Sequence, residues 1–335
     1  MQEARFYETL DDKKVQCHLC PHECVIAPDK TGLCKVRRNT EGVLYSLIYG
    51  EYTSANLDPI EKKPLYHFYP GEHIFSIGTY GCNFTCEFCQ NWQISQEVCD
   101  TRTVLPKEIV DLCLSRGSIG IAYTYNEPTI WYEFVYDCSA AAHEANLVNA
   151  LVTNGYISPE PLRELLPHVD AMNIDLKSFR DAFYKKTCGG RLQPVLDTIA
   201  TASKRTHVEL TTLIVPGQND DPAEWDEAAR WIAENASPDT PLHLSAYTPR
   251  YKMKEKATTP QVLEDARKAY RKYLNYVYLG NVITADGGHT LCPGCNEVLI
   301  ARSGYDVEVK NLKGDVCTKC NVKVPIVSSR GNENG

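Results

Sequence analysis

Three closely spaced cysteines carry the most direct chemical signal in this sequence. Cys82, Cys86 and Cys89 follow a C-x3-C-x2-C pattern directly after an apolar run that ends at Gly81. Zinc sites and ordinary electron-transfer clusters take four protein ligands. Three thiolates on a cubane [4Fe-4S] cluster instead leave one iron free to bind another molecule. The pattern therefore predicts a [4Fe-4S] site with an open iron, and the alternative is a partial zinc knuckle or a redox-regulated thiol cluster.

Eight further cysteines form two sets of four. The chain has 15 cysteines, and such a number in a cytosolic protein indicates metal rather than disulfides. The C-terminal set is two C-x2-C pairs around a stretch that predicts a β-hairpin, the pattern of a zinc ribbon, with an auxiliary Fe–S cluster as the alternative. The N-terminal set is less regular and predicts either zinc or an auxiliary Fe–S cluster. The two sets are Cys292, Cys295, Cys317 and Cys320, and Cys17, Cys20, Cys24 and Cys34.

Other possible ligands have simpler interpretations. His18 and His22 lie within the N-terminal set and are interpreted as solvated loop residues rather than ligands. Cys188 is interpreted as a buried thiol, with a thiyl relay near the substrate as the alternative.

Alternating strand and helix patterns between about Ile74 and Val282 must position the central cysteines. Short β-rich runs alternate with segments of 3.6-residue periodicity. Such regular alternation predicts parallel strands joined by right-handed crossovers. Six units predict an α/β fold, a partial (β/α)6 TIM-like barrel that is open on one side. The predicted strands are 74–81, 120–125, 149–155, 171–177, 207–217 and 242–247, and the predicted helices are 106–116, 129–146, 159–166, 191–204, 222–235 and 260–273.

The barrel divides the chain into four predicted parts. Residues 1–72 are a four-cysteine metal-binding segment with a lead-in, and residues 73–285 are the barrel. Residues 286–327 are the zinc-ribbon-like element, and residues 328–335 are expected to be a disordered tail.

Polar motifs follow the carboxyl ends of the predicted strands, which is where barrels of this kind carry their active sites. The motifs, in chain order, are Gly81 to Gln90, Asn126-Glu127-Pro128, Asn154-Gly155, Asp175-Leu176-Lys177 and Tyr247-Thr248. Their placement supports the prediction of a site independently of the cysteine spacing.

With these motifs the chain resembles the radical S-adenosylmethionine (SAM) superfamily, in which the open iron binds the amino and carboxylate groups of SAM. The stretch 124–128 stands where that family has a Gly-Gly-Glu-Pro-like turn, which holds the SAM amino group. Asp175 and Lys177 resemble a pair that flanks SAM in the pyruvate formate-lyase activase branch. The resemblance leaves the catalytic residue unassigned. It implies cofactor contacts from Phe88, Gln90, Asn126, Glu127, Asn154, Asp175, Lys177 and Thr248.

Two positions depart from the family pattern. Asn126 replaces a glycine of the general motif, and Thr248 stands where the activase pattern has a ribose-contacting histidine. Both departures argue against a simple transfer of the activase function.

A narrower resemblance covers nearly the whole chain. The sequence is similar to the radical SAM component of the AmmeMemoRadiSam system, whose members are encoded beside Memo-like and AMMECR-like proteins. The matching strings are 17–24, 58–71, 81–96, 125–130, 276–282 and the closing cysteine pairs. The resemblance implies Memo-like and AMMECR-like partners.

The resemblance also implies a reaction. A reduced cluster would cleave SAM to methionine and a 5′-deoxyadenosyl radical, which takes a hydrogen from an unidentified substrate. This is anaerobic oxidoreductase chemistry, with flavodoxin or ferredoxin as electron donor and a protein segment among the candidate substrates. One alternative is a glycyl-radical-enzyme activase, and another is a multi-cluster electron-transfer or scaffold protein. Glu127, Asp175 and Lys177 together argue against the last, since a carrier needs no SAM pocket.

Composition limits the partners and the location. The formal net charge is −8 and no long basic run is present, which argues against nucleic acid or an anionic membrane surface as the main partner. The first residues lack the charged and apolar regions of a secretory signal. No stretch approaches the roughly 18 apolar residues of a membrane span. We therefore expect a cytoplasmic protein.

Overall fold

An eight-stranded sheet forms the centre of the protein in the computed structural model, which describes residues 1–284 and 286–328. The spatial order of its strands is β16-β15-β14-β13-β12-β11-β9-β8. Strand β8 pairs antiparallel with β9, and all the other neighbours are parallel. The strands are β8 (Ser54–Pro59), β9 (His73–Gly78), β11 (Gly120–Tyr123), β12 (Val148–Thr153), β13 (Ala171–Asp175), β14 (His207–Ile214), β15 (Leu242–Ala246) and β16 (Val277–Gly280).

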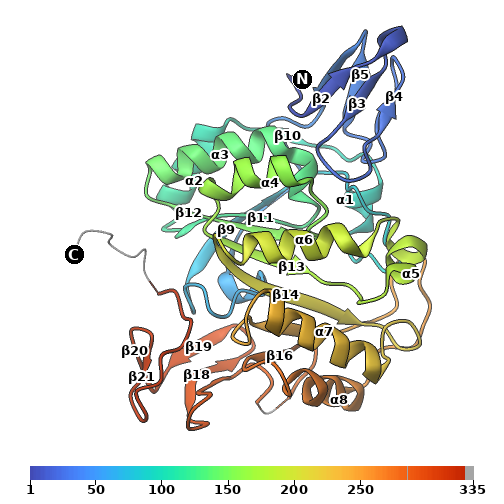
Figure 1. Ribbon diagram of the computed structural model, residues 1–335. Coiled ribbons are helices and arrows are strands. Elements are labelled where there is room, and N and C mark those ends of the chain that lie inside the picture. Colours follow the sequence, from blue (N-terminus) through green and yellow to red (C-terminus); the bar gives the residue numbers. More distant parts are fainter. Residues whose placement is uncertain (285, 329–335) are drawn as a thin grey trace.

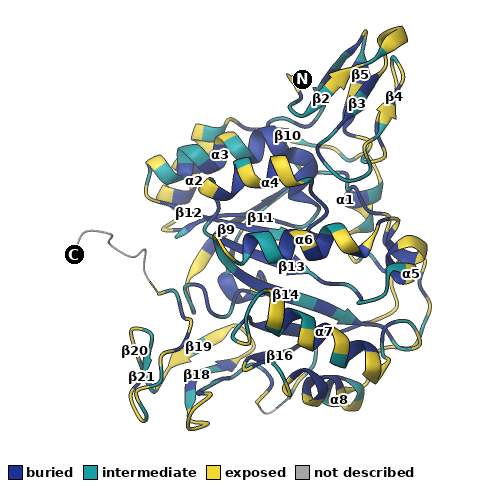
Figure 2. Cartoon of the chain, viewed as in Figure 1, coloured by how far each residue is buried: buried dark blue, intermediate teal, exposed yellow. Residues whose placement is uncertain are grey.

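Helices connect the parallel strands and lie along the outside of the sheet (Figure 1). Prolines begin α2, α4, α7 and α8, at the position where a helix needs no backbone N–H. The apolar side chains recur at helical spacing and face inward, as Val195 and Ile199 do in α6. Figure 2 shows the result, with buried strands inside and exposed outer faces on α7 and α8. The helices are α2 (Pro106–Ser115), α3 (Tyr132–Glu144), α4 (Pro159–Leu165), α6 (Leu192–Ala202), α7 (Pro222–Asn235) and α8 (Pro260–Tyr270).

This architecture confirms the predicted α/β partial barrel. Every predicted strand and helix is present, and the ends agree to within a few residues. The structure adds β8 as an antiparallel edge and makes the apolar run at 276–282 a further parallel strand, β16. The strand order is linear, and within the described residues β8 and β16 do not pair with each other, so the sheet stays open.

Small sheets at the N-terminal end carry the first cysteine set. One sheet has the order β2-β3-β4 and another the order β1-β6-β5, while β7 pairs with β10. Residues 43–52 contribute two of these strands, β6 and β7. Figure 1 shows strands β2–β5 projecting at one end of the molecule. The strands are β1 (Gln2–Glu3), β2 (Tyr7–Thr9), β3 (Val15–Cys17), β4 (Val25–Ile26), β5 (Arg37–Thr40), β6 (Val43–Ser46), β7 (Glu51–Tyr52) and β10 (Arg102–Thr103).

The second cysteine set lies at the opposite end of the molecule, among short strands (Figure 1). Strands β18 and β19 form the hairpin that the sequence predicts between the two cysteine pairs. A separate apolar cluster joins this element to the barrel, with Tyr276 and Tyr278 packing near Cys292 and Leu299. The strands are β17 (Thr290–Leu291), β18 (Val298–Ser303), β19 (Asp306–Val309), β20 (Leu312–Lys313) and β21 (Val316–Cys317). The proposed boundaries of the four parts of the chain remain predictions, and residues 329–335 of the expected tail lie outside the described residues.

The remaining helical elements are short. Helix α1 (Trp92–Gln96) follows the central cysteines, and α5 (Asp181–Phe183) continues into a π-helical turn, Tyr184–Cys188. Single 3-10 turns lie at Asp11–Lys13, Ile60–Lys62, Pro128–Trp131 and Leu166–His168. Among the described residues, no helix is long and apolar enough to span a membrane.

Buried hydrogen bonds to β14 hold the segment between β8 and β9 against the sheet. The carboxylate of Glu209, on β14, accepts the backbone N–H groups of Tyr66 and His67 at 2.9 and 2.7 Å. The side chain of His243 lies 2.6 Å from the same carboxylate. Because buried polar groups need such partners, the network holds this segment in one place against the barrel.

Candidate metal and cofactor site

The residues predicted for the central site, except Thr248, meet at a cavity of about 500 Å³ at the carboxyl ends of the parallel strands. Cys82, Cys86 and Cys89 line it together with Phe88 and Gln90, all from the loop after β9. The same cavity is also lined by side chains from the ends of β11, β12 and β13, which are Asn126, Glu127, Asn154, Asp175 and Lys177. The tertiary structure thus joins motifs that lie far apart in the sequence.

Hydrogen bonds position the cysteine sulfur atoms. The Sγ of Cys82 accepts the backbone N–H of Phe84 at 3.3 Å, and the amide of Asn154 lies 3.8 Å from it. The Sγ of Cys89 lies 3.2 Å from the hydroxyl oxygen of Ser95, at the end of the loop. Donors of this kind stabilise thiolates, which are the form that binds metal.

The three thiols differ in their electrostatic surroundings. Burial raises the pKa of Cys82 and Cys89 above the ordinary value of a thiol. The pKa of Cys86 is lowered instead, first by a hydrogen bond with Cys188 and then by the positive charge of Lys177. Cys188 therefore packs against the loop as a buried neighbour of Cys86, and its backbone oxygen accepts the N–H of Thr85 at 2.8 Å.

The turn after β11 is hydrogen-bonded to both the cysteine loop and the end of the next strand, β12. The amide of Asn126 donates to the backbone oxygen of Gly81 at 2.9 Å. The buried carboxylate of Glu127 accepts the hydroxyl of Thr153 at 2.7 Å and the backbone N–H of Asn154 at 2.8 Å. Burial raises the pKa of Glu127.

The strained residue in this turn is Tyr125, which directly precedes Asn126, the position that departs from the family pattern. The residue with a positive φ is Tyr125, at 73°. A side chain in this left-handed region is disfavoured, so surrounding contacts must hold it. The hydroxyl of Tyr125 donates to Asp58 at 2.7 Å, and its backbone oxygen accepts the amide of Asn91.

Asp175 and Lys177 form an ion pair at the wall of the cavity. The Nζ of Lys177 lies 2.7 Å from a carboxylate oxygen of Asp175 and 5.7 Å from the centre of the Phe88 ring. Burial acts to lower the pKa of Lys177, but the carboxylate of Asp175 and the nearby thiols raise it well above its ordinary value. The ammonium group therefore stays charged inside the cavity.

Sequence reasoning missed several lining residues. Lys62 and Lys63 reach the cavity from the segment anchored by Glu209, and both pair with Asp58. Thr211, Ser245 and Asn281 line it from the ends of β14, β15 and β16. Side chains alternate between the two faces of a strand, so the alternation along β14 and β15 could have predicted that Thr211 and Ser245 face the cavity. Lys62 and Lys63 belong to the family-like string 58–71, which left open either a solvated charged turn or a position on the active-site side. The contact of their segment with a distant strand decided for the second.

Thr248 differs from the expectation. It is exposed and is not among the residues that line the cavity. Strand β15 ends at Ala246, and the chain beyond it leaves the sheet, so that Ser245 is the residue from this strand that reaches the cavity. A ribose contact from Thr248 receives no support from this geometry.

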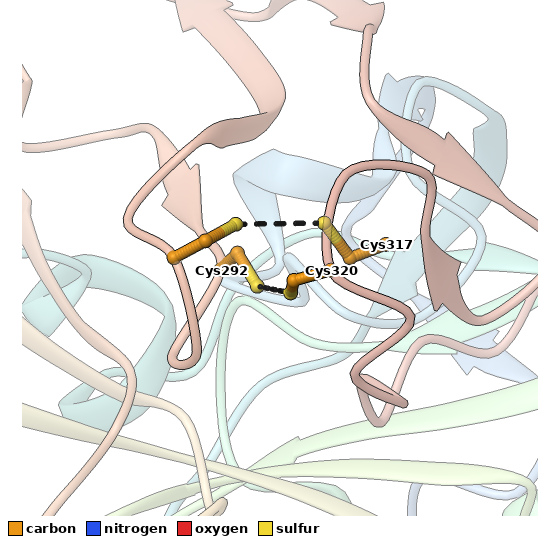
Figure 3. Close-up of side chains that lie close together, drawn as sticks. Cys292, Cys317 and Cys320 are labelled. Carbon is orange, nitrogen blue, oxygen red and sulfur yellow. Dashed lines mark hydrogen bonds between the residues drawn. The ribbon is translucent and has the colours of Figure 1, made fainter.

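The two flanking cysteine sets differ in geometry. In the C-terminal set all four sulfur atoms lie within 4.8 Å of one another. The Sγ atoms of Cys292 and Cys320 are 3.4 Å apart and those of Cys295 and Cys317 are 3.8 Å apart (Figure 3). The N-terminal set instead surrounds a cavity of about 20 Å³, which it lines together with His22, Arg37 and Asn83. His18 lies outside that lining, 3.5 Å from the carboxylate of Glu8.

Comparisons with known proteins agree with this geometry. The model of the radical SAM superfamily matches residues 76–232. An uncharacterized protein of Methanocaldococcus jannaschii is 45% identical, over 98% of this chain and 100% of that protein. A GTP 3′,8-cyclase of Lactiplantibacillus plantarum is 31% identical, over 42% of this chain and 45% of the cyclase. Among solved structures, a radical SAM methyltransferase from Sphaerobacter thermophilus aligns with a TM-score of 0.51 at 16% identity, covering 63% of this chain and 67% of that one, a likeness of fold alone.

Proposed function

Because this chain belongs to the radical SAM superfamily, whose members are enzymes, we propose that it cleaves SAM at a [4Fe-4S] cluster held by Cys82, Cys86 and Cys89. The cleavage would serve to abstract a hydrogen from a substrate that enters the same cavity. The single observation that supports the proposal most is that the three cysteines share one cavity with Glu127 and the pair of Asp175 and Lys177.

The residues present fit a cluster with an open iron. Within the described part of the chain, the cysteines that line this cavity are these three. Their sulfur atoms do not form a group within 4.8 Å of one another, as those of the C-terminal set do. A cluster of several irons needs thiolate ligands and that wider spacing.

The residues also fit SAM. A volume of about 500 Å³ lies within the usual range of roughly 300–1,000 Å³ for sites that hold small molecules. Lys177 offers a buried positive charge for a carboxylate, and Asp175 offers an acceptor for an ammonium group. Glu127 holds the turn and the backbone of Asn154 at the same wall.

When bound, the cluster would supply the electron that breaks a carbon–sulfur bond of SAM and produces the hydrogen-abstracting radical. The chain's own residues would bind and orient. Lys177 and Asp175 would hold the charged end of SAM, and Asn126 would keep the cysteine loop in place through Gly81. The buried ring of Phe88 covers one side of the cavity and would limit access of water to it.

Anaerobic turnover tests the proposal. Reconstituted protein with SAM and dithionite is expected to release 5′-deoxyadenosine, and a Cys86→Ala variant is expected to release none above background. Cys99 belongs to none of the three sets, so a Cys99→Ala variant is the matched control and should retain the activity. A Cys86→Ala variant that still formed 5′-deoxyadenosine would disprove the mechanism.

A glycyl-radical-enzyme activase is the second candidate. It is favoured by a relative of Methanocaldococcus jannaschii that is named for glycyl-radical enzyme activation, with 26% identity over 61% of this chain and 77% of that protein. The measurement is electron paramagnetic resonance after mixing with a candidate partner enzyme. A glycyl-radical signal would favour this candidate over a different substrate, and its absence from every candidate encoded nearby would count against it.

The partners are also proposals. We propose a flavodoxin or ferredoxin as electron donor, and Memo-like and AMMECR-like proteins as partners of the enzyme. We further propose zinc for the C-terminal set. Four Zn–S bonds of about 2.3 Å in a tetrahedron place the sulfur atoms roughly 3.8 Å apart. The separations of 3.4 and 3.8 Å in this set support that choice over a larger cluster.

A further inference from the structure

The N-terminal cysteines have the chemistry of a metal site but not the spacing of a zinc site. All four belong to the described residues, and no three of their sulfur atoms lie mutually within 4.8 Å. Tetrahedral zinc would hold them roughly 3.8 Å apart. The C-terminal set meets that requirement in the same molecule, so the difference lies in how the chain arranges each set.

The space between the N-terminal cysteines gives a second, independent indication. Cys17, Cys20, Cys24 and Cys34 line a cavity of about 20 Å³. A cavity above roughly 10–15 Å³ has room for a water-sized sphere. Four sulfur atoms about 2.3 Å from a zinc ion leave no such room between them. A cubane cluster stands between its thiolates and therefore holds them farther apart than a single metal ion does.

Arg37 adds a buried donor at the same cavity. Its side chain is 1% exposed, and it lines the cavity beside the cysteines. One terminal nitrogen lies 3.9 Å from the Sγ of Cys17, and the other pairs with the buried carboxylate of Glu133. Within the described structure its Nε has no hydrogen-bond partner. Buried donors rarely stay unpaired, and the sulfides of a cluster would add acceptors to those that the thiolates of either metal site offer.

From the spacing, the cavity and Arg37 together, we propose that Cys17, Cys20, Cys24 and Cys34 hold a second iron–sulfur cluster of the [4Fe-4S] type. This site is distinct from the site at Cys82, Cys86 and Cys89, and it does not depend on the proposed SAM chemistry.

The two sites share a wall. Asn83 lines the N-terminal cavity, and its side-chain oxygen accepts the amide of Asn154, which lines the central cavity, at 2.8 Å. The ring of His22 donates to the backbone oxygen of Asn83 at 2.7 Å. A Cβ added at Gly81 would lie 2.9 Å from the backbone oxygen of Cys34, so the two cysteine loops touch at a glycine. Two reduced clusters in these positions would be close neighbours.

Metal and sulfide analysis of anaerobically reconstituted full-length protein tests the proposal. A triple Cys82→Ala, Cys86→Ala, Cys89→Ala variant is expected to keep about four irons and four acid-labile sulfides per chain, all on the N-terminal set. If this variant contained no iron, the proposal would be overturned, and a second zinc besides that of the C-terminal set would identify the N-terminal set as a zinc site.

The reciprocal variant checks the assignment. A double Cys20→Ser, Cys24→Ser variant is expected to lose about half of the iron and to keep the zinc, while Cys99→Ser keeps all of both. Should the double variant fail to fold, the triple variant still decides the question. Electron paramagnetic resonance of the dithionite-reduced wild type should show broadening from two interacting clusters. The triple and the double variant should each lose that broadening, and Cys99→Ser should keep it.

The test of the N-terminal cluster can fail or succeed independently of the test of the proposed SAM cleavage. Iron retained in the triple variant, together with no 5′-deoxyadenosine from the wild type, would leave this site standing and would remove the proposed function. Release of 5′-deoxyadenosine by a wild type with about four irons in all would do the reverse.

Discussion

The N-terminal and C-terminal cysteine sets have the same number of thiols and opposite geometries. In the C-terminal set, two knuckles bring the four sulfur atoms within 4.8 Å of one another. In the N-terminal set, the strands β3 and β4 and the loop around Cys34 keep the sulfur atoms apart, around a cavity. The comparison teaches that the number of cysteines predicts a metal site, whereas the backbone that carries them sets the spacing that a metal ion or cluster would have to fit.

The surroundings of the two sets differ as well. The N-terminal set contacts the central loop through Gly81 and Asn83, and a buried ion pair of Arg37 and Glu133 lies beside it. The C-terminal set belongs to a separate apolar cluster with Tyr276 and Tyr278. We therefore expect the first set to affect the central site and the second to affect the folding of its own element.

Loss of the zinc that we propose for the C-terminal set should have the largest effect. Cys292 is buried and its Sγ lies 3.4 Å from that of Cys320, so Cys292→Ser removes a ligand from the closed set. Structural zinc contributes on the order of 10 kcal/mol to the folding of such units. We expect about one zinc to be lost and residues 286–328 to exchange their amide hydrogens rapidly, with the iron content unchanged.

The matched change is Cys24→Ser in the N-terminal set, which should lower iron and leave zinc. Metal analysis and hydrogen exchange of the two variants, side by side, measure the contrast. If the Cys292→Ser variant kept its zinc and its slow exchange, the C-terminal set would not be a zinc site.

Removing the buried cation beside the N-terminal set should have the next largest effect. Arg37→Met leaves the Glu133 carboxylate buried without its charged partner, which costs about 3–5 kcal/mol of unfolding free energy. Lys323 and Asp315, near the C-terminal set, form an exposed pair at 3.0 Å, and Lys323→Met should cost at most about 1 kcal/mol.

Urea unfolding of both variants under anaerobic conditions provides the measurement. Equal losses would contradict the buried role of Arg37. A loss of iron in Arg37→Met, with none in Lys323→Met, would sharpen the link between Arg37 and the N-terminal site.

The smallest expected difference in stability is between alanine substitutions at two glycines, Gly81 and Gly314. Gly81 has a φ of 91°, and an added Cβ would lie 2.8 Å from a methyl carbon of Val36, so Gly81→Ala should cost at least about 2 kcal/mol. Gly314 has a φ of 61° with no heavy atom within 4 Å of an added Cβ, so Gly314→Ala should cost about 1 kcal/mol. Thermal unfolding of the two variants measures the difference, and an equal shift in Tm would argue against close packing of the Cys34 and Cys82 loops.

Much of the fold could be predicted because its signals are local. Periodicity within each segment indicates a strand or a helix, and the regular alternation of the two dictates parallel strands. The placement of Asn126, Glu127, Asn154 and Asp175 in one cavity followed from that order, since the carboxyl ends of parallel strands meet at one edge. Lys62 and Lys63 could not be placed in this way, because they reach the cavity only through the contact of their segment with Glu209.

The sequence by itself determined the three cysteine sets, the order of strands and helices, and the motifs at the strand ends. The tertiary structure alone decided that Ser245 rather than Thr248 reaches the cavity, and that one outer set is compact and the other spread. Spacing along the chain limits which thiols can meet, but the distance between sulfur atoms depends on packing between distant segments. The contact of Cys34 with Gly81 is such a packing, and no pattern within either segment encodes it.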